Sequence, residues 1–429
     1  MPRRARVVVL RRHRAGPNPA RSHLGRVSAA QTRPKWDLAG GGPAGAGSGR
    51  IGGVRDDGGG GGCCGAAGPT AAQRLRSHLL SEPASSLGET AAHMLAVQAQ
   101  EFWSGRWALA VRTAGEPVLR AVDAAFENGT LVRSWTQRGT LHIVRSVDLA
   151  GMLAVTAHRQ QRAAAGILRG LAIDEAVLAT AERAARHALR GVNRLTRDEF
   201  ADLLRGAGIE TERSRGNHIL SALAVRGVLA FGPVVPREGG PSRDQFLVAV
   251  DDLPSARVPD DPLAEMFTGY IRSHGPARVE DFRWWAGLPI GLSRRAAEAA
   301  GDRVVEIEAG LFAAPAAAEP AEPASVSGPS PDLGSGDVVA LPAFDEYYLS
   351  YADRTTVCAP DLAARIGPTL NGQVAPILVS GGRVIGTWRH SVAAGRHHLP
   401  PGPMLVADPA VAASAIEASL ARVSRFLAD

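Results

Sequence analysis

The sequence predicts an α+β protein, mainly helical, with tandem winged-helix domains and a small C-terminal β unit. Three observations predict this class. Capped, Ala-rich helical segments fill most of residues 71–312. A helix, a turn, a second helix and a hairpin follow one another within 193–255, which is the order of a winged helix. Short β-rich runs separated by turns occur after residue 337.

Residues 1–70 form a separate segment by composition. They contain 12 basic and three acidic residues, and an unbroken glycine run extends from Gly58 to Gly62. A segment without a helical or strand period cannot bury enough apolar surface to offset its ordering entropy. We therefore predict a disordered, low-complexity tail. A mis-called start, with translation beginning downstream of the tail, is a second hypothesis for the same stretch.

The excess of basic charge is confined to this tail. The whole chain has 429 residues, 48 of them basic and 42 acidic, and a pI near 9.8. The residues after position 70 include 36 basic and 39 acidic ones. The pI is therefore no DNA-binding signal for the body of the chain, where DNA affinity would need arginines clustered on one face.

The first folded domain is predicted at 71–192, is winged-helix-like and contains a Gln-x-Gln motif. Asn128-Gly129 is a helix C-cap signal, and the β-rich runs on either side of Arg138-Gly139 predict a hairpin over 131–144. The apolar run 107–111 is predicted to be a strand. Helices are predicted at 71–80, 87–97, 117–127, 146–158 and 174–189.

The second domain, 193–255, shows the winged-helix order most clearly. Thr196 and Glu199 form a capping box that opens a helix to residue 205. A second helix is predicted at 215–226, and the strands 228–231 and 245–250 are joined by a polar loop. A third domain, 256–312, is predicted to repeat this architecture, with helices at 261–273, 279–285 and 293–300 and a strand at 304–307.

The C-terminal part begins with a change of composition. Residues 313–336 are rich in Pro and Ala and are predicted to be a linker or an extended loop. Residues 337–429 are predicted to be a β unit with a closing helix. Asp408 is the expected N-cap of that helix and Pro409 its first residue.

The body of the chain lacks residues that several chemistries require. Lys35 is the only lysine, so residues from 70 onward offer neither a Schiff-base amine nor a P-loop lysine. Cys63, Cys64 and Cys358 have no metal-ligand spacing, so we expect no metal, no cofactor and a reducing cytoplasm. Because no apolar run approaches the ~20 residues of a membrane span, we also expect no membrane association.

Four segments of the body resemble a known family and occur in that family's order. They read LAVQAQ at 95–100, VRSW at 132–135 with RGTLH at 138–142, LPAFDEY at 341–347 with YADR at 351–354, and GTWR at 386–389. In these segments the chain is similar to the winged-helix DNA-binding family that contains the AlkZ-type DNA glycosylases, over about residues 71–429. The resemblance implies tandem winged helices curved around duplex DNA. It also implies a monofunctional glycosylase that excises N7-alkylated purines, unhooks interstrand crosslinks and uses a Gln-x-Gln motif.

Gln98 and Gln100 match that motif and are the candidate catalytic residues. On a strand, residues two apart point to the same side, so their carboxamides could hold one water between them. Glutamine is not a general base, so such a site works by positioning and electrostatics. That suits a leaving base that is already cationic, as an N7-alkylguanine is. The alternative is that both glutamines cap a helix end.

The candidate DNA contacts come from three parts of the chain. Arginine suits phosphate contacts, and histidine could touch phosphate or the lesion; the alternative on the hairpin is a solvated Arg and a hydrogen-bonded His. The start of the second helix of 193–255 is where recognition helices meet DNA, unless that helix is buried between domains. The candidates are Arg138 and His142 on the hairpin, Arg213, Arg215 and His218 on that helix, and Arg133 and Arg389 within the matching segments.

Asp345 and Glu346 are adjacent carboxylates. On a strand they would face opposite ways, so we do not expect an acid–base pair. Asp345 is a candidate for supporting the site, either by orienting water or by pairing with Arg354. A purely structural ion pair is the favoured alternative.

These observations support one enzyme hypothesis and two others. The first is a metal-free, monofunctional DNA glycosylase acting on N7-alkylated purines or crosslinks in double-stranded DNA, monomeric and nucleoid-associated in the cytoplasm. The second is a non-catalytic winged-helix regulator, and the third is a damage sensor that binds lesions without cutting. The Gln-x-Gln motif favours the first, since a regulator has no evident need for it.

Overall fold

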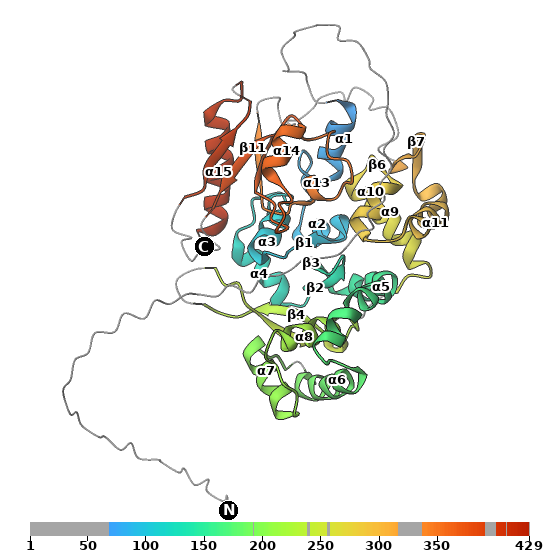
Figure 1. Cartoon of the computed structure of the whole chain (residues 1–429). Helices are drawn as coiled ribbons and strands as arrows, with labels where there is room; N and C mark the ends of the chain where they lie inside the picture. Colours follow the sequence, from blue (N-terminus) through green and yellow to red (C-terminus); the bar gives the residue numbers. More distant parts are fainter. Residues whose placement is uncertain are drawn as a thin grey trace, which may run out of the picture. The chain divides into compact units, whose positions relative to one another are not determined.

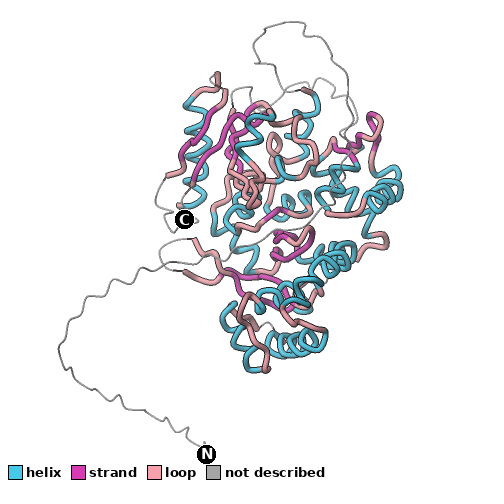
Figure 2. The backbone as a smooth tube through the Cα atoms, viewed as in Figure 1, coloured by secondary structure: helices cyan, strands magenta, loops and turns pink. Residues whose placement is uncertain are grey.

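The structure is a computed structural model that describes residues 68–428, except 192, 238–240, 255–257, 316–336, 391–399 and 409. The predicted tail therefore lies outside the described residues up to position 67, as does nearly all of the predicted linker. Among the described residues no helix is both long and apolar enough to cross a bilayer. Helices predominate, and the strands form short antiparallel groups (Figure 2).

A five-stranded antiparallel sheet lies at the centre of the site region. It joins the hairpin of the first predicted domain to the hairpin of the second, where Arg133 pairs with Phe231. Strands from both sides of the predicted boundary at 192–193 thus share one sheet. Its order is β1-β3-β2-β4-β5, with β1 Val97–Gln98, β2 Leu131–Gln137, β3 Thr140–Arg145, β4 Leu229–Val234 and β5 Gln245–Ala249.

Four helices come from the first predicted domain, and α2 and α4 pack against its hairpin: α1 Pro69–Ser77, α2 Leu87–Met94, α3 Phe102–Ala110 and α4 Leu119–Glu127. The prediction of a strand at 107–111 is wrong, because these residues finish α3 and the turn that follows it. Every residue of α3 is buried. A helix buried on all sides has no apolar stripe of helical period, so its continuous apolar run looks the same as a buried strand.

The next helices build the part of the fold at the foot of Figure 1. The predicted capping box is confirmed: Thr196 accepts from the main chain of Glu199, and the Glu199 side chain accepts in return from Thr196. The core formed by these helices and the β4–β5 hairpin also includes Leu141 of β3. The helices are α5 Leu149–Gly170, α6 Glu175–Leu189, α7 Arg197–Gly206 and α8 Arg215–Val225.

The segment after residue 260 has three helices and a small sheet of its own. The helices are α9 Pro262–His274, α10 Val279–Ala286 and α11 Ile290–Ala300. The sheet has the order β6-β8-β7, with β6 Ala277–Arg278, β7 Val305–Glu308 and β8 Leu311–Ala313. Short 3-10 helices lie at Ser146–Asp148, Val250–Asp252 and Gly301–Arg303.

The C-terminal strands form a four-stranded sheet of order β12-β11-β10-β9. The prediction for the closing helix is wrong at its start: α15 begins at Ala413, with Ala412 as N-cap, and Pro409 lies outside the described residues. The elements are β9 Val338–Leu341, α13 Glu346–Leu349, α14 Pro360–Ile366, β10 Ile377–Ser380, β11 Arg383–Arg389, β12 Gly402–Val406 and α15 Ala413–Leu427.

The two ends of the described chain share one core. The Trp107 ring of α3 lies 5.1 Å from that of Phe426 on α15, and its indole N–H donates to the Ala340 carbonyl at 2.8 Å. In Figure 1, α15 stands beside β11, and α13 lies near α1 and α2. This packing brings residues 338–351 against the segment that carries the Gln-x-Gln motif.

Candidate active site

The Gln-x-Gln motif lies on the edge strand of the five-stranded sheet. Leu95, with φ of +63°, turns the chain out of α2, and Val97 and Gln98 then pair with Ile143 and His142. Only Gln98 belongs to the strand and is buried, whereas Gln100 follows the strand and is exposed. The strand environment is thus confirmed for Gln98 and wrong for Gln100, because the chain leaves the sheet after Ala99.

Both carboxamides are held by the turn between β2 and β3. Arg138 donates through Nη2 to Oε1 of Gln98 at 3.1 Å, and the main-chain N–H of Leu141 donates to Oε1 of Gln100 at 3.3 Å. Since both donors lack acceptor capacity, these contacts assign the oxygen side of each amide. The two NH₂ groups and one further lone pair on each oxygen stay available for a ligand.

The predicted hairpin turn at Arg138-Gly139 is confirmed, and it directs Arg138 inward. Both residues have positive φ, +53° and +70°, as a tight two-residue turn requires. Gly287 lies against this side chain, since a Cβ there would come within 2.9 Å of Cγ of Arg138. Burial lowers the pKa of Arg138. The guanidinium contacts Gln98 instead of pointing away from the protein.

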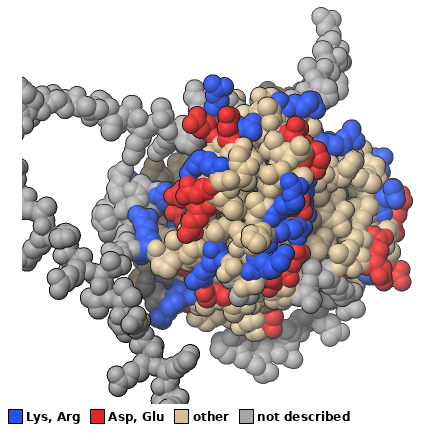
Figure 3. Space-filling view, turned by 90° about the horizontal axis from the view of Figure 1, so that it is seen from below, with Lys and Arg blue, Asp and Glu red and all other residues tan. Residues whose placement is uncertain are grey.

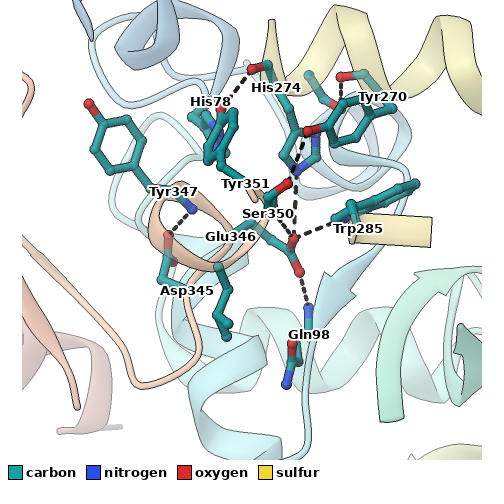
Figure 4. A network of polar contacts seen from close by, with 12 residues as sticks. His78, Gln98, Tyr270, His274, Trp285, Asp345, Glu346, Tyr347, Ser350 and Tyr351 are labelled. Carbon is teal, nitrogen blue, oxygen red and sulfur yellow. Dashed lines mark hydrogen bonds and ion pairs between the residues drawn. The ribbon is translucent and has the colours of Figure 1, made fainter. Parts of the chain in front are cut away.

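Glu346 meets the motif from the opposite side, and sequence analysis missed it. The prediction that residues 345 and 346 lie on a strand is wrong: β9 ends at Leu341, and Glu346 opens α13. Its side chain is fully buried, and its Oε1 accepts the main-chain N–H of Gln98 at 2.8 Å (Figure 4). The neighbouring segment LPAFDEY carried the resemblance, but nothing local marked this carboxylate.

Three further groups surround the Glu346 carboxylate. Trp285 donates from its indole N–H at 3.0 Å, Ser350 donates from its hydroxyl, and Nε2 of His274 lies 3.6 Å away. Burial opposes ionisation, but the hydrogen bond and charge of a protonated His274, followed by the charges of a protonated His142 and of Arg138, outweigh it and lower the pKa of Glu346 to about 2. Burial lowers the pKa of His274. Glu346 is therefore an anion beside a neutral imidazole at neutral pH.

A polar chain continues from His274 to the first helix. Tyr351 donates to the His274 carbonyl at 2.6 Å, and its hydroxyl lies 2.8 Å from Nε2 of His78 (Figure 4). Because the hydroxyl has one proton, His78 is the donor in that second contact. The Tyr270 ring stacks on His274 at 4.8 Å. The network ties α1, α9 and α13 together behind Gln98.

Asp345 has a structural partner, and the predicted pairing with Arg354 is wrong. Both Asp345 oxygens accept from Arg112, at 2.7 and 2.9 Å, and both side chains are fully buried. Asp345 also caps α13 by accepting from the Tyr347 N–H at 2.9 Å. Arg354 instead donates to the Tyr348 carbonyl at 3.1 Å and lies over the Trp284 ring. The structural ion pair that sequence analysis favoured is present, with a different arginine.

Arg133 and His142, two of the predicted DNA contacts, are buried. Arg133 donates to the carbonyls of Ala99 and Gln100 and to the Gln245 side chain, at 2.8, 3.3 and 3.2 Å. Burial lowers its pKa to about 9. These contacts hold the chain that follows Gln98, so they support a positioning role for Arg133. A DNA contact by this residue stays a prediction.

His142 lies in a row of polar side chains across the sheet. It stands opposite Gln98 on β1 and Ser134 on β2, so the three side chains share one face. Its Nδ1 lies 3.1 Å from the Thr140 carbonyl, whereas Nε2 has no protein partner among the described residues. Burial, followed by the charge of Arg138, lowers the pKa of His142 to about 3. The imidazole is therefore neutral.

The remaining predicted DNA contacts lie at α8 and at the end of β11. Arg213 is exposed and has φ of +51°, where the chain turns into α8. Arg215 donates to the carbonyls of Leu171 and Ala172, and His218 is half-buried. Arg389 is exposed at the end of β11. In Figure 1, β11 and α8 lie on different sides of β1.

Some exposed arginines are paired with carboxylates. Arg194 donates to Glu127 at 3.1 Å, and Arg425 to Glu116 at 3.0 Å. Figure 3 shows a face on which basic side chains form a run near the middle, with acidic side chains beside it and elsewhere on the same face. Among the described residues no group of three or more His, Cys, Asp or Glu could hold a metal ion. The groups that surround Gln98 are the Arg138 guanidinium, the Glu346 carboxylate and the His142 imidazole.

The buried imidazoles predict an acid-labile fold. The unfolded His142 binds a proton with a pKa near 6.5, but the folded residue binds one only near pH 3, so acid favours the unfolded chain. From this shift we expect His142 alone to remove about 2 kcal/mol of unfolding free energy between pH 7 and pH 5. Urea unfolding of wild type and His142→Gln at several pH values measures this. A variant with the wild-type pH slope would contradict it.

Comparisons with known proteins agree on one family. The sequence profile of the family described as "DNA glycosylase AlkZ-like" matches residues 91–426. A relative from Streptomyces sahachiroi named "Interstrand DNA cross-link repair glycosylase" is 26% identical over 317 residues, which cover 71% of this chain and 82% of the relative. The solved structure of the Streptomyces sahachiroi DNA glycosylase AlkZ has a similar fold, with a TM-score of 0.66 and 24% identity over 83% of this chain and 95% of that chain. Gln98, Arg138 and Glu346 lie within the range that the family profile matches.

Proposed function

The chain belongs to the AlkZ-like DNA glycosylase family, and we propose that it is a monofunctional glycosylase for N7-alkylated purines in duplex DNA, interstrand crosslinks among them. The observation that carries the proposal is the fixed position of Gln98. Its side chain is held by Arg138 and its main chain by Glu346. The name of the Streptomyces sahachiroi relative supports crosslinks as one substrate class.

The reaction would proceed by water attack on a sugar that has already lost most of its bond to the base. An N7-alkylguanine is cationic and leaves as a neutral base, so the enzyme has no need of a strong general acid. The free hydrogen-bonding positions of Gln98 and Gln100 would orient the water and the sugar. The proton released by that water passes to solvent. Positioning and electrostatics would supply the acceleration.

Lysine usage supports hydrolysis without a lyase step. A glycosylase that also cleaves the strand commonly does so through an amine that forms a Schiff base with the sugar. The described residues contain no lysine, since Lys35 lies outside them. We therefore propose that the product is an intact strand with an abasic site.

DNA binding is assigned to the helical units around the site. We propose that α7, α8 and the β4–β5 hairpin form one winged helix, and that α9–α11 with β7 and β8 form another, within the domains 71–192, 193–255, 256–312 and 337–429. Arg213, His218 and Arg389 are the proposed contacts to double-stranded DNA. The protein would act as a monomer.

The test uses the full chain and a duplex with one 7-methylguanine. We expect release of free 7-methylguanine, detected by mass spectrometry, and a strand that breaks only after hydroxide treatment. Borohydride should trap no protein–DNA adduct. A duplex crosslinked by a nitrogen mustard should yield separated strands under denaturing conditions.

Two other results would favour the alternatives. Tight binding to the methylated duplex without base release would indicate a damage sensor. Equal binding to methylated and undamaged duplexes without base release would indicate a regulator. Either result would overturn the glycosylase proposal.

A further inference from the structure

Glu346 is a buried anion that has no cationic partner in contact among the residues that the structure describes. Its side chain is fully buried, and among the described residues no arginine lies within ion-pair distance of it. Its close contacts are the neutral donors of Gln98, Trp285 and Ser350, with His274 at 3.6 Å. A buried carboxylate that is not paired with a cation is destabilising. Its presence calls for a reason beyond packing.

The adjacent carboxylate shows what a structural role looks like in the same turn. Asp345 is neutralised by two hydrogen bonds from Arg112, at 2.7 and 2.9 Å, and caps α13. Within the described part of the chain Glu346 has no such counterion, and it instead accepts from the motif strand. The two neighbours therefore differ in charge balance, although both are buried.

Gln98 lies between two opposite charges. Arg138 holds the side chain through Oε1 at 3.1 Å, and Glu346 holds the main-chain N–H at 2.8 Å. The motif strand is only two residues long and lies at the sheet edge. The contact from α13 therefore fixes a strand that has little pairing of its own.

We propose that Glu346 is an electrostatic positioning residue for glycosidic bond cleavage: it anchors Gln98 and places a negative charge beneath the site where the sugar becomes cationic. The inference rests on the proposed glycosylase function. Positive charge develops on the sugar as the base departs, and a preorganised anion in a water-poor interior stabilises such charge more strongly than it would in water. Glu346 acts through the field and through Gln98, without bonding to the substrate.

The first experiment compares two buried carboxylates of the full-length protein. Glu346→Gln removes the charge with little change in size. The matched control is Asp281→Asn: Asp281 is also buried and accepts a main-chain N–H, that of Ala352, at 2.9 Å. We expect Glu346→Gln to slow single-turnover excision of 7-methylguanine by about 100-fold. Asp281→Asn should affect thermal stability and leave excision by the folded protein unchanged.

A second readout separates charge from structure. Two duplexes are compared, one with a cationic pyrrolidine and one with a neutral tetrahydrofuran in place of the abasic sugar. The pyrrolidine imitates the sugar when it is positively charged, and the tetrahydrofuran is its uncharged counterpart. Wild type should prefer the pyrrolidine duplex, and Glu346→Gln should lose most of that preference without weaker binding of the tetrahydrofuran duplex. Glu346→Asp, which keeps the charge, should retain the preference. If Glu346→Gln does not fold, Glu346→Asp is the test variant. We expect Glu346→Asp to bind the pyrrolidine duplex more tightly than the tetrahydrofuran duplex.

The outcomes separate the two proposals. An active wild type with unchanged excision and unchanged pyrrolidine preference in Glu346→Gln would overturn this inference alone. A folded Glu346→Asp without the preference would overturn it as well. A wild type that releases no base would overturn the proposed function and this inference with it.

Discussion

Gln98→Ala is expected to lower the single-turnover rate of 7-methylguanine excision by about 100-fold or more. Gln98 is buried; Arg138 holds its side chain and Glu346 holds its main chain. Because the carboxamide is already in position, it needs no reorganisation during the reaction, and the substitution removes this preorganised group. Gln100 is exposed, and its side chain has one longer contact, with the main-chain N–H of Leu141 at 3.3 Å. From the same principle we expect a smaller loss, about tenfold, for Gln100→Ala.

Base release with enzyme in excess over DNA measures both effects. Binding of each variant to a tetrahydrofuran duplex shows whether DNA affinity is retained. Gln161→Ala is the matched control, because Gln161 is an exposed glutamine on α5 away from the site. Excision by Gln98→Ala at the wild-type rate would remove the basis for a catalytic role of the motif.

Arg112→Met is expected to destabilise the fold by about 3–5 kcal/mol, because it leaves the Asp345 carboxylate buried without its counterion. Both side chains are fully buried, and Arg112 also donates to the carbonyls of His78 and Ala108, at 3.0 and 2.9 Å. The pair joins the end of α3 to the start of α13. Its loss should therefore loosen the contact between the motif segment and the C-terminal part.

Urea unfolding at pH 7.5 measures this destabilisation. The control is Arg425→Met, which breaks an exposed ion pair with Glu116 and should cost less than about 1 kcal/mol. The double variant Arg112→Met/Asp345→Asn should lose less unfolding free energy than the two single variants lose in sum, since it leaves no charge unpaired. Equal destabilisation by Arg112→Met and Arg425→Met would disprove the importance of burial.

Some errors in the sequence-based prediction have a common cause. The apolar run at 107–111 was consistent with a strand or a buried helix, and burial of the whole of α3 decided for the helix. Asp408-Pro409 had the chemistry of a helix start, but α15 begins at Ala413. In both cases a local signal was compatible with two structures, and packing selected one.

The prediction of the site was better for its motif than for its surroundings. The Gln-x-Gln motif and the Arg138-Gly139 turn were recognised, and the structure brings them into contact. The inward direction of Arg138 and the burial of Arg133 and His142 were not predictable. In a short β-rich run, a polar side chain can face either the solvent or the protein interior, and the sequence alone does not distinguish the two. No local pattern marks Glu346, because its partners Gln98 and Trp285 are distant in the sequence.

By itself, the sequence determined the features that act over a few residues: the capping box at Thr196, the hairpin at Arg138-Gly139, and most of the helices. Caps and turns depend on contacts within about four positions, so they leave a readable spacing. Only the tertiary structure decided that Glu346 meets Gln98, 248 residues earlier in the chain, and that Asp345 pairs with Arg112, 233 residues earlier. Such contacts depend on how separate segments pack into one core, and packing of distant segments has no local spacing to read.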